Sequence, residues 1–245
     1  LYMALSGYWL KSMNTLSMVG VAVPLALAIG FGFGVLGAKS RRANAALQPT
    51  LDLMQTIPTF AYLAPLVVLF GFGPVPGVLA SMIYAAPPMT RNVLLGLQSV
   101  PQELREVSSM SGTTPWQRFC YIELPCAKQQ ILVGINQLVL ASLSMVIIAA
   151  VIGGFDDIGR EVLVATNKGS ARFGQALAAG IVIVLLAVVI DRLTRAAATR
   201  RETVGRGTGR RAIPILWQLA GLGLVLATSI ALKSYADIVA VASAV

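Results

Sequence analysis

Long stretches without a charged residue dominate the chain and predict helices that cross a membrane. Crossing the hydrocarbon core takes about 20 mostly apolar residues in a helix, because backbone polar groups cannot be left unpaired in lipid. The longest such stretch, between Asp52 and Arg91, exceeds one crossing and is interrupted by a Gly- and Pro-rich turn at residues 71–77. We therefore expect an all-α, polytopic membrane bundle of about six spans. The expected spans are 13–37, 50–70, 76–97, 128–152, 174–192 and 212–232.

The positive charges predict the orientation of these spans, because cationic loops are retained in the cytoplasm. The chain has 19 Lys+Arg against 10 Asp+Glu, a net charge of +9. With the N-terminus outside, most of the cations fall in cytoplasmic loops. The outside then keeps Lys11, Arg160, Lys168, Arg172 and Lys233. We expect this topology, in which the positive excess records membrane orientation and not nucleic-acid binding.

Composition excludes several classes of protein. Hydrophobic residues make up 56% of the chain and charged residues 12%, which excludes disorder. The absence of histidine excludes a Ser-His-Asp triad and a His-ligated zinc site. Cys120 and Cys126 form no metal-ligand pattern, and no phosphate-binding P-loop occurs. We expect no metal, no cofactor and no ATP hydrolysis in this chain. Because it opens at Leu1 without a basic signal-peptide region, we interpret it as an excerpt or a processed chain.

The predicted cytoplasmic loop at about 98–127 is more patterned than a connector. Ser99 with Gln102 fits a helix-capping box, and Thr114 with Gln117 repeats it. Gly112 lies between them, where a reversal of the chain needs positive φ. We expect a helix, a glycine turn and a second, amphipathic helix. Two interpretations stay open at this point: a helix pair lying in the lipid headgroups, or a docking element for a cytosolic partner.

The same loop resembles the signature loop of ABC-importer permeases. Glu106-Val107-Ser108, Gly112 and Ile122-x-Leu124-Pro125 match its Glu-Ala-Ala, Gly and Ile-x-Leu-Pro positions with the full spacing, except that Val-Ser replaces the two alanines. In that family the loop forms the coupling helix, which sits in a cleft of the ATPase subunit. The resemblance implies ATPase-coupling roles for Glu106, Ser111, Gly112, Thr113, Thr114, Pro115, Trp116, Ile122, Leu124 and Pro125.

Other segments are similar to the glycine betaine/proline/choline branch of these permeases. They are 54–65, 69–77, Pro87-Pro88 with Arg91, Asn136-Gln137 with 143–145, and 191–194. The resemblance implies the type I importer permease fold for residues 1–195, with the coupling loop at 99–125. Residues 196–211 then form a basic cytoplasmic linker, for which nucleic-acid binding is the less favoured alternative. Residues 212–245 form an additional span and external tail; one hypothesis is that they lead into a further domain.

Polar residues on one face of a membrane helix mark a candidate solute path. Asp52, Gln55, Thr59 and Tyr62 have helical spacing on the second span, and Asn136 shares a face with Ser144 on the fourth. The candidate pathway residues are Gln55, Thr59, Tyr62, Asn136 and Ser144. The alternative is that such side chains only hold helices together. Aromatic faces at Tyr62, Phe60 and Tyr84 would suit a quaternary amine.

The resemblance also implies partners and a location. They are a cytosolic ABC ATPase dimer that binds ATP and Mg, a second permease subunit or half, an extracytoplasmic substrate-binding protein, and the lipid of the bacterial cytoplasmic (inner) membrane. The external loop 153–173, through Asp156, Asp157 and Arg160, could dock the binding protein; a solvated polar loop is the alternative.

The implied function is the permease subunit of an ATP-driven importer for a solute such as glycine betaine, choline, carnitine, proline or trimethylamine N-oxide. The principal alternative is an ATP-independent secondary carrier or channel, which often carries ionisable residues at mid-membrane; here only Asp52 and Arg91 come near.

Overall fold

The computed structural model describes residues 7–153, 156–167 and 173–199. These residues form helices and no strand. The predicted span at 212–232 and most of the basic linker at 196–211 lie outside the described residues. The helices are α2 (Trp9–Lys39), α3 (Arg41–Thr56), α4 (Thr59–Phe70), α5 (Pro74–Gln98), α6 (Gln102–Met110), α7 (Pro115–Arg118), the π-helix η1 (Phe119–Glu123), α8 (Leu124–Gly153), α9 (Ile158–Asn167) and α10 (Phe173–Thr199).

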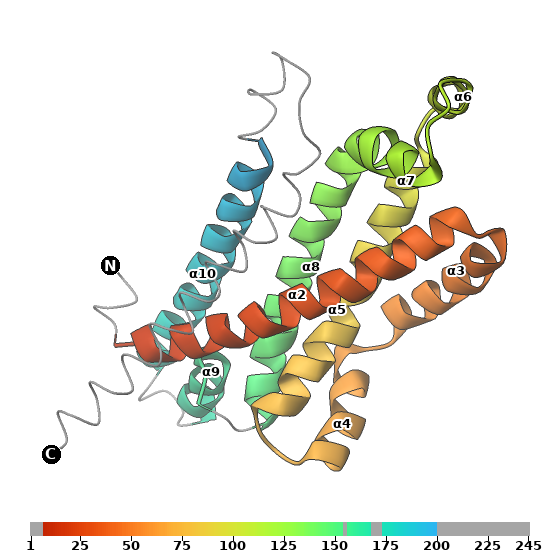
Figure 1. Ribbon diagram of the computed structural model, residues 1–245. Helices are drawn as coiled ribbons and strands as arrows, with labels where there is room; N and C mark the ends of the chain where they lie inside the picture. The colour runs from red at the N-terminus through yellow and green to blue at the C-terminus, as the bar shows by residue number, and fades with distance from the viewer. Residues whose placement is uncertain (1–6, 154–155, 168–172, 200–245) are drawn as a thin grey trace, which may run out of the picture.

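The long helices α2, α5 and α8 form the core of the bundle. α2 crosses α5 and α8 obliquely, and α10 lies along the other side of α8 (Figure 1). The core combines Val23, Met89, Val93, Leu138 and Val146, all fully buried. Small residues permit α2 and α5 to lie close together, as is usual between membrane helices. A Cβ added at Gly34 of α2 would come within 2.6 Å of Val93 Cβ of α5.

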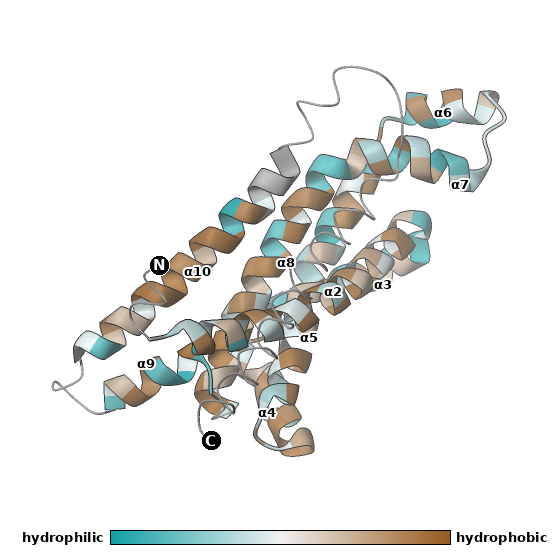
Figure 2. Ribbon diagram, turned by 60° about the vertical axis from the view of Figure 1, so that its left-hand side comes forward, coloured by the Kyte–Doolittle hydropathy of each residue, from teal (hydrophilic) through white to brown (hydrophobic). Residues whose placement is uncertain are grey.

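Among the described residues, three helical segments are long and apolar enough to cross a membrane: α2, the rod formed by α7, η1 and α8, and α10. The pair α3 and α4 makes a fourth if it is counted as one broken span. α5 occupies the position of the third predicted span and is less apolar, because it carries Pro87, Pro88 and Arg91. Apolar residues run along α2, α8 and α10, whereas α6 and α7 mix polar and apolar residues (Figure 2). The predicted positions of the first five spans therefore coincide with helices.

The second predicted span is not one straight helix. α3 and α4 meet at an angle of 90°. The break falls at Ile57, which is extended (φ −67°, ψ 128°) because Pro58 disfavours the helical conformation of the residue before it. The Tyr62 hydroxyl donates a hydrogen bond to the Met54 carbonyl across this break. The predicted continuous polar stripe is wrong in consequence: Gln55 lies on α3, and Thr59 and Tyr62 lie on α4.

Candidate functional site

The α6–α7 loop (residues 99–125) lies at one end of α5 and α8 and projects from the bundle (Figure 1). The predicted capping box at Ser99 is wrong, because Ser99 still belongs to the last turn of α5 and its hydroxyl donates to the Gly96 carbonyl at 2.9 Å. α6 begins after Pro101, whose extended backbone (φ −55°, ψ 140°) serves as the N-cap. The predicted first helix of the loop is therefore present as α6, but Pro101, and not the side chain of Ser99, occupies its N-cap position.

The reversal between α6 and α7 has the predicted construction. Gly112 has φ 70°, which favours glycine, and an added Cβ would meet open space there. The Thr114 hydroxyl accepts from the Gln117 backbone N–H at 3.3 Å, while the Gln117 side chain accepts from the Thr114 N–H at 2.9 Å, which is a complete capping box. The Thr113 hydroxyl donates to the Ser108 carbonyl at 2.8 Å and the Ser111 hydroxyl to Val107 at 2.9 Å. The turn is therefore held by its own side chains.

The α6–α7 loop exposes several large apolar side chains and the carboxylate of Glu106. Glu106 is exposed and accepts a hydrogen bond from the Gln102 side chain at 2.8 Å. Met110, at 87% exposure, is among the exposed apolar residues of the loop, with Leu104, Val107, Trp116 and Tyr121. Large apolar side chains exposed on a projecting helix pair are typical of a protein contact or a membrane surface.

The second half of the loop is continuous with the fourth span. α7 passes through η1 directly into α8, so residues Pro115–Gly153 form one helical rod. The rings of Trp116 and Phe119 lie 6.0 Å apart, with Trp116 exposed and Phe119 buried in the core. Ile122 and Leu124 are half-buried and Pro125 is exposed. The predicted coupling residues thus fall into an exposed group and a group that packs on the bundle.

The predicted pathway residues do not form one lining among the described residues. Gln55 and Ser144 are exposed, and the Ser144 hydroxyl is bonded to the carbonyl of Leu140 on its own helix. Tyr62 lies edge-on to Tyr84, with ring centroids 6.0 Å apart, beside Met145 of α8. No hydrogen bond or ring contact joins any two of the five candidates within the described ranges. Their role in the pathway stays a prediction.

Three polar contacts between helices were missed by sequence reasoning. Asn92 of α5 donates to Gln137 at 2.8 Å and accepts from Gln130 at 2.7 Å, both on α8. Arg91 of α5 donates to Asp52 of α3 at 2.5 Å. A signal was present for the ion pair: these opposite charges bound the same uncharged stretch. All three contacts join helices, the role that the alternative interpretation gave to such residues.

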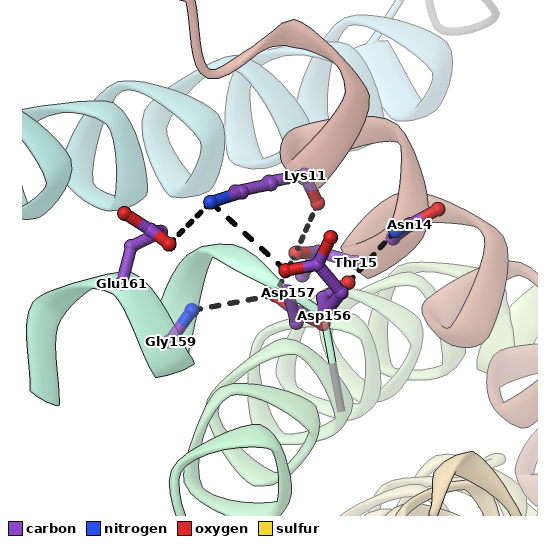
Figure 3. Close-up of polar contacts among 7 residues, drawn as sticks. All are labelled: Lys11, Asn14, Thr15, Asp156, Asp157, Gly159 and Glu161. Atoms are coloured by element: carbon purple, nitrogen blue, oxygen red, sulfur yellow. Dashed lines mark hydrogen bonds and ion pairs between the residues drawn. The ribbon is translucent and has the colours of Figure 1, made fainter. Parts of the chain in front are cut away.

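The opposite end of α8 carries a second polar cluster, which we call the α9 corner (Figure 3). It joins the first turns of α2 to residues 156–167. Lys11 forms an ion pair with Glu161 and lies 3.9 Å from Asp156. The Asn14 side chain donates to the Asp156 carbonyl at 2.7 Å. The predicted polar loop is therefore in part the helix α9, tied to α2.

Asp157 faces inward at the α9 corner. Its exposure is 0%, and its Oδ1 accepts from the Thr15 hydroxyl and from the Gly159 N–H. Burial raises the pKa of the Asp157 carboxyl, and the hydrogen bonds from Thr15 and the backbone oppose that rise. The prediction that Asp157 offers an external docking surface is wrong, because its side chain packs against α2. Asp156 and Arg160 are exposed, and their docking role stays a prediction.

Comparison with known proteins gives one matching family over residues 30–203, described as "Binding-protein-dependent transport system inner membrane component". The glycine betaine/carnitine transport permease protein GbuB of Listeria monocytogenes is 43% identical over 189 residues, which is 77% of this chain and 66% of that protein. The glycine betaine/proline betaine transport system permease protein ProW of Escherichia coli is 41% identical, over 83% of this chain and 56% of that protein. The trimethylamine N-oxide transport system permease protein TmoV of Ruegeria pomeroyi is 41% identical, over 79% and 29%. The matched part thus spans between about a third and two thirds of these relatives.

Two solved structures share the fold. An amino acid ABC transporter chain superposes with a TM-score of 0.66 at 18% identity, covering 82% of this chain and 98% of that chain. A chain of the inward-facing MetNI methionine ABC transporter superposes with a TM-score of 0.62 at 23% identity, covering 74% and 92%.

Proposed function

The chain belongs to the family of binding-protein-dependent transport system inner membrane components, and from that membership we propose that it is the permease part of an ATP-driven importer. Residues 1–195 would supply its transmembrane domain in the bacterial cytoplasmic membrane. The basic charges on the side of the α6–α7 loop support an orientation in which this loop faces the cytosol.

The observation that carries the proposal is the α6–α7 loop. It exposes large apolar side chains and the carboxylate of Glu106, and its reversal is fixed by Gly112 and the Thr114 capping box. A rigid, projecting loop at the ends of two long helices can pass a displacement from a cytosolic partner to the bundle. We propose that this partner is the ATPase dimer, which binds ATP and Mg, and that the chain itself carries no cofactor.

The proposed substrate is a small solute with a methylated, positively charged nitrogen. The support is that the relatives' names specify glycine betaine, carnitine, proline betaine and trimethylamine N-oxide. The Tyr62–Tyr84 ring pair offers aromatic faces that attract such cations. An external binding protein, docking near Asp156 and Arg160, would supply the selectivity. A second permease subunit or half would complete the pathway.

Uptake into proteoliposomes that contain this chain, its cognate ATPase and binding protein tests the proposal. We expect uptake of at least one of glycine betaine, choline, carnitine, proline or trimethylamine N-oxide. Uptake should require ATP on the side of the membrane where the ATPase is bound. Glu106→Ala should reduce ATP-driven uptake roughly tenfold, within the usual range of coupling between sites.

Gly112 supplies a matched pair of variants. Gly112→Val forces a β-branched residue to positive φ, whereas Gly112→Asn places there a residue that tolerates it. Valine should abolish most uptake and asparagine should retain it. Uptake without ATP, or normal uptake in both Glu106→Ala and Gly112→Val, would favour the ATP-independent carrier instead.

A further inference from the structure

A carboxylate on the inner side of the α6–α7 loop lies between two guanidinium groups. Glu123 ends the π-helix η1, and its side chain is only 13% exposed. Its Oε1 lies 3.3 Å from Arg118 Nε and 3.8 Å from Arg105 Nε. Both Nε atoms are buried without a hydrogen-bond acceptor in the described part of the chain, so this carboxylate compensates their charge. Its position matches the variable residue of the Ile-x-Leu-Pro motif, and the resemblance assigns it no role.

The two arginines connect different helices to Glu123. Arg105 belongs to α6, and its Nη2 donates to the Leu97 carbonyl at 2.6 Å. That carbonyl is in the last turn of α5, where backbone acceptors have no partner within the helix. Arg118 belongs to α7, which runs through η1 into α8. Glu123 therefore sits where the ends of α5, α6 and α8 meet.

A third long helix reaches the same place. Lys39, in the last turn of α2, lies with its Nζ 4.7 Å from the ring centroid of Phe119, a distance typical of a cation–π contact. Phe119 opens η1 and is buried in the cluster that α2, α5 and α8 share. π-helical turns are rare and are frequent at functional sites. This one separates the projecting loop from the membrane-spanning part of the rod.

We infer that Glu123 is the positioning residue that makes the α6–α7 loop move as one body with α5 and α8. Without its charge, Arg105 and Arg118 would repel each other beside the junction. A push on the exposed surface of α6 would then be absorbed at the turns around Pro101 and Gly112, because nothing else in the described contacts ties α6 to α7 by charge. The inference rests on the proposed function in one respect: that the push comes from the ATPase.

The positioning role is testable without any transport assay. Spin labels at Met110→Cys on α6 and Val133→Cys on α8, both exposed positions, report the placement of the loop on the rod. The background carries Cys120→Ser and Cys126→Ser. In the detergent-purified chain we expect a narrow distance distribution, a clearly broader one with Glu123→Gln, and an unchanged one with Glu103→Gln. Glu103 is an exposed carboxylate of α6, outside the ion pairs around Glu123. Equal distributions for Glu123→Gln and the parent would overturn the inference.

The consequence for coupling is measured as ATP hydrolysed per solute molecule taken up in the reconstituted importer. Glu123→Gln should raise this ratio roughly tenfold, by lowering uptake more than hydrolysis, while Glu103→Gln leaves it unchanged. A normal ratio in Glu123→Gln contradicts the inference and leaves the importer proposal standing. Uptake without ATP in the parent protein contradicts the importer proposal, and the label distances then still decide the positioning role.

Discussion

The two ends of the α8 rod each hold a buried or nearly buried carboxylate, and the two are compensated in different ways. Glu123, at the α6–α7 loop, lies against the guanidinium groups of Arg105 and Arg118. Asp157, at the α9 corner, accepts hydrogen bonds from the neutral Thr15 hydroxyl and the Gly159 N–H, and its Oδ2 is a buried atom without a partner in the described chain.

The charge of Glu123 therefore holds helices in place, whereas Asp157 does not need a charge to do so. Removing one partner of a partly buried ion pair leaves the other charge uncompensated. Replacing Glu123 by a neutral residue should therefore lower the stability of the fold. The Asp157 Oδ1 accepts hydrogen bonds from Thr15 and Gly159, and the side-chain oxygen of an asparagine can accept the same two bonds. We connect the first arrangement with force transmission and the second with static attachment of α2 to α9.

Glu123→Ala should have the largest effect on stability. The substitution leaves the two partly exposed guanidinium groups of Arg105 and Arg118 without their carboxylate, so we expect the free energy of unfolding to fall by about 2 kcal/mol. This loss is below the value for fully buried pairs, because solvent screens part of the charge. Thermal unfolding in detergent measures it. Glu103→Ala is the control, and equal unfolding temperatures for the two variants would show that the ion pairs around Glu123 contribute nothing.

Thr15→Val should come next. Valine keeps the shape of threonine and removes the hydroxyl that donates to Asp157, which leaves the buried Oδ1 with the longer hydrogen bond from the Gly159 N–H, at a cost of about 1–2 kcal/mol. The double variant with Asp157→Val should lose less than the sum of the two single losses, because each single substitution removes the same Thr15–Asp157 contact, while the Gly159 N–H still loses its acceptor. If the double variant is simply the sum of two losses, the Thr15–Asp157 contact is not what the first substitution removed.

Lys11→Met tests the exposed edge of the α9 corner. The Lys11–Glu161 pair is partly exposed, so we expect a loss of at most about 1 kcal/mol. The loss should shrink in 1 M salt, where exposed charges are screened. A loss that salt leaves unchanged would indicate that packing of the lysine stem, and not its charge, is responsible.

Asp157→Asn should have the smallest effect at neutral pH, about 0.5 kcal/mol or less in either direction. Its signature is the pH dependence. Because burial raises the pKa of Asp157 above 3.8, the folded state binds the proton more tightly than the unfolded state. The parent therefore loses stability as pH rises from about 4 through the raised pKa, and the asparagine variant should not. Unfolding temperatures between pH 4 and 7 compare the two slopes, and parallel slopes would exclude this titration.

Much of the fold could be predicted because charge-free stretches in lipid leave few alternatives. The break of the second span could not. Pro24, Pro49, Pro65 and Pro87 all lie inside helices, while Pro58 ends one. Each proline disfavours the helical conformation of the residue before it, yet of these five only Pro58 ends a helix, so the sequence does not say which proline breaks its span. The lost stripe of Gln55, Thr59 and Tyr62 follows from that one residue.

The loop was predicted better than its surroundings, because capping and glycine turns are local. Thr114 and Gly112 act within a few residues, and both were assigned correctly. Ser99 failed because α5 extends over it. Asp157 and Glu123 depend on partners that sequence spacing does not bring together: Thr15 is 142 residues from Asp157, and Arg105 meets Glu123 only after the chain reverses at Gly112.

The central claim is that the α6–α7 loop is the surface on which the ATPase acts. Its most direct test is the accessibility of a thiol at Met110→Cys compared with one at Thr166→Cys, an exposed position of the α9 corner, in a background with Cys120→Ser and Cys126→Ser. Addition of the cognate ATPase to the purified chain should slow the modification of Cys at position 110 and leave position 166 unchanged. Equal rates at position 110 with and without the ATPase would contradict the account.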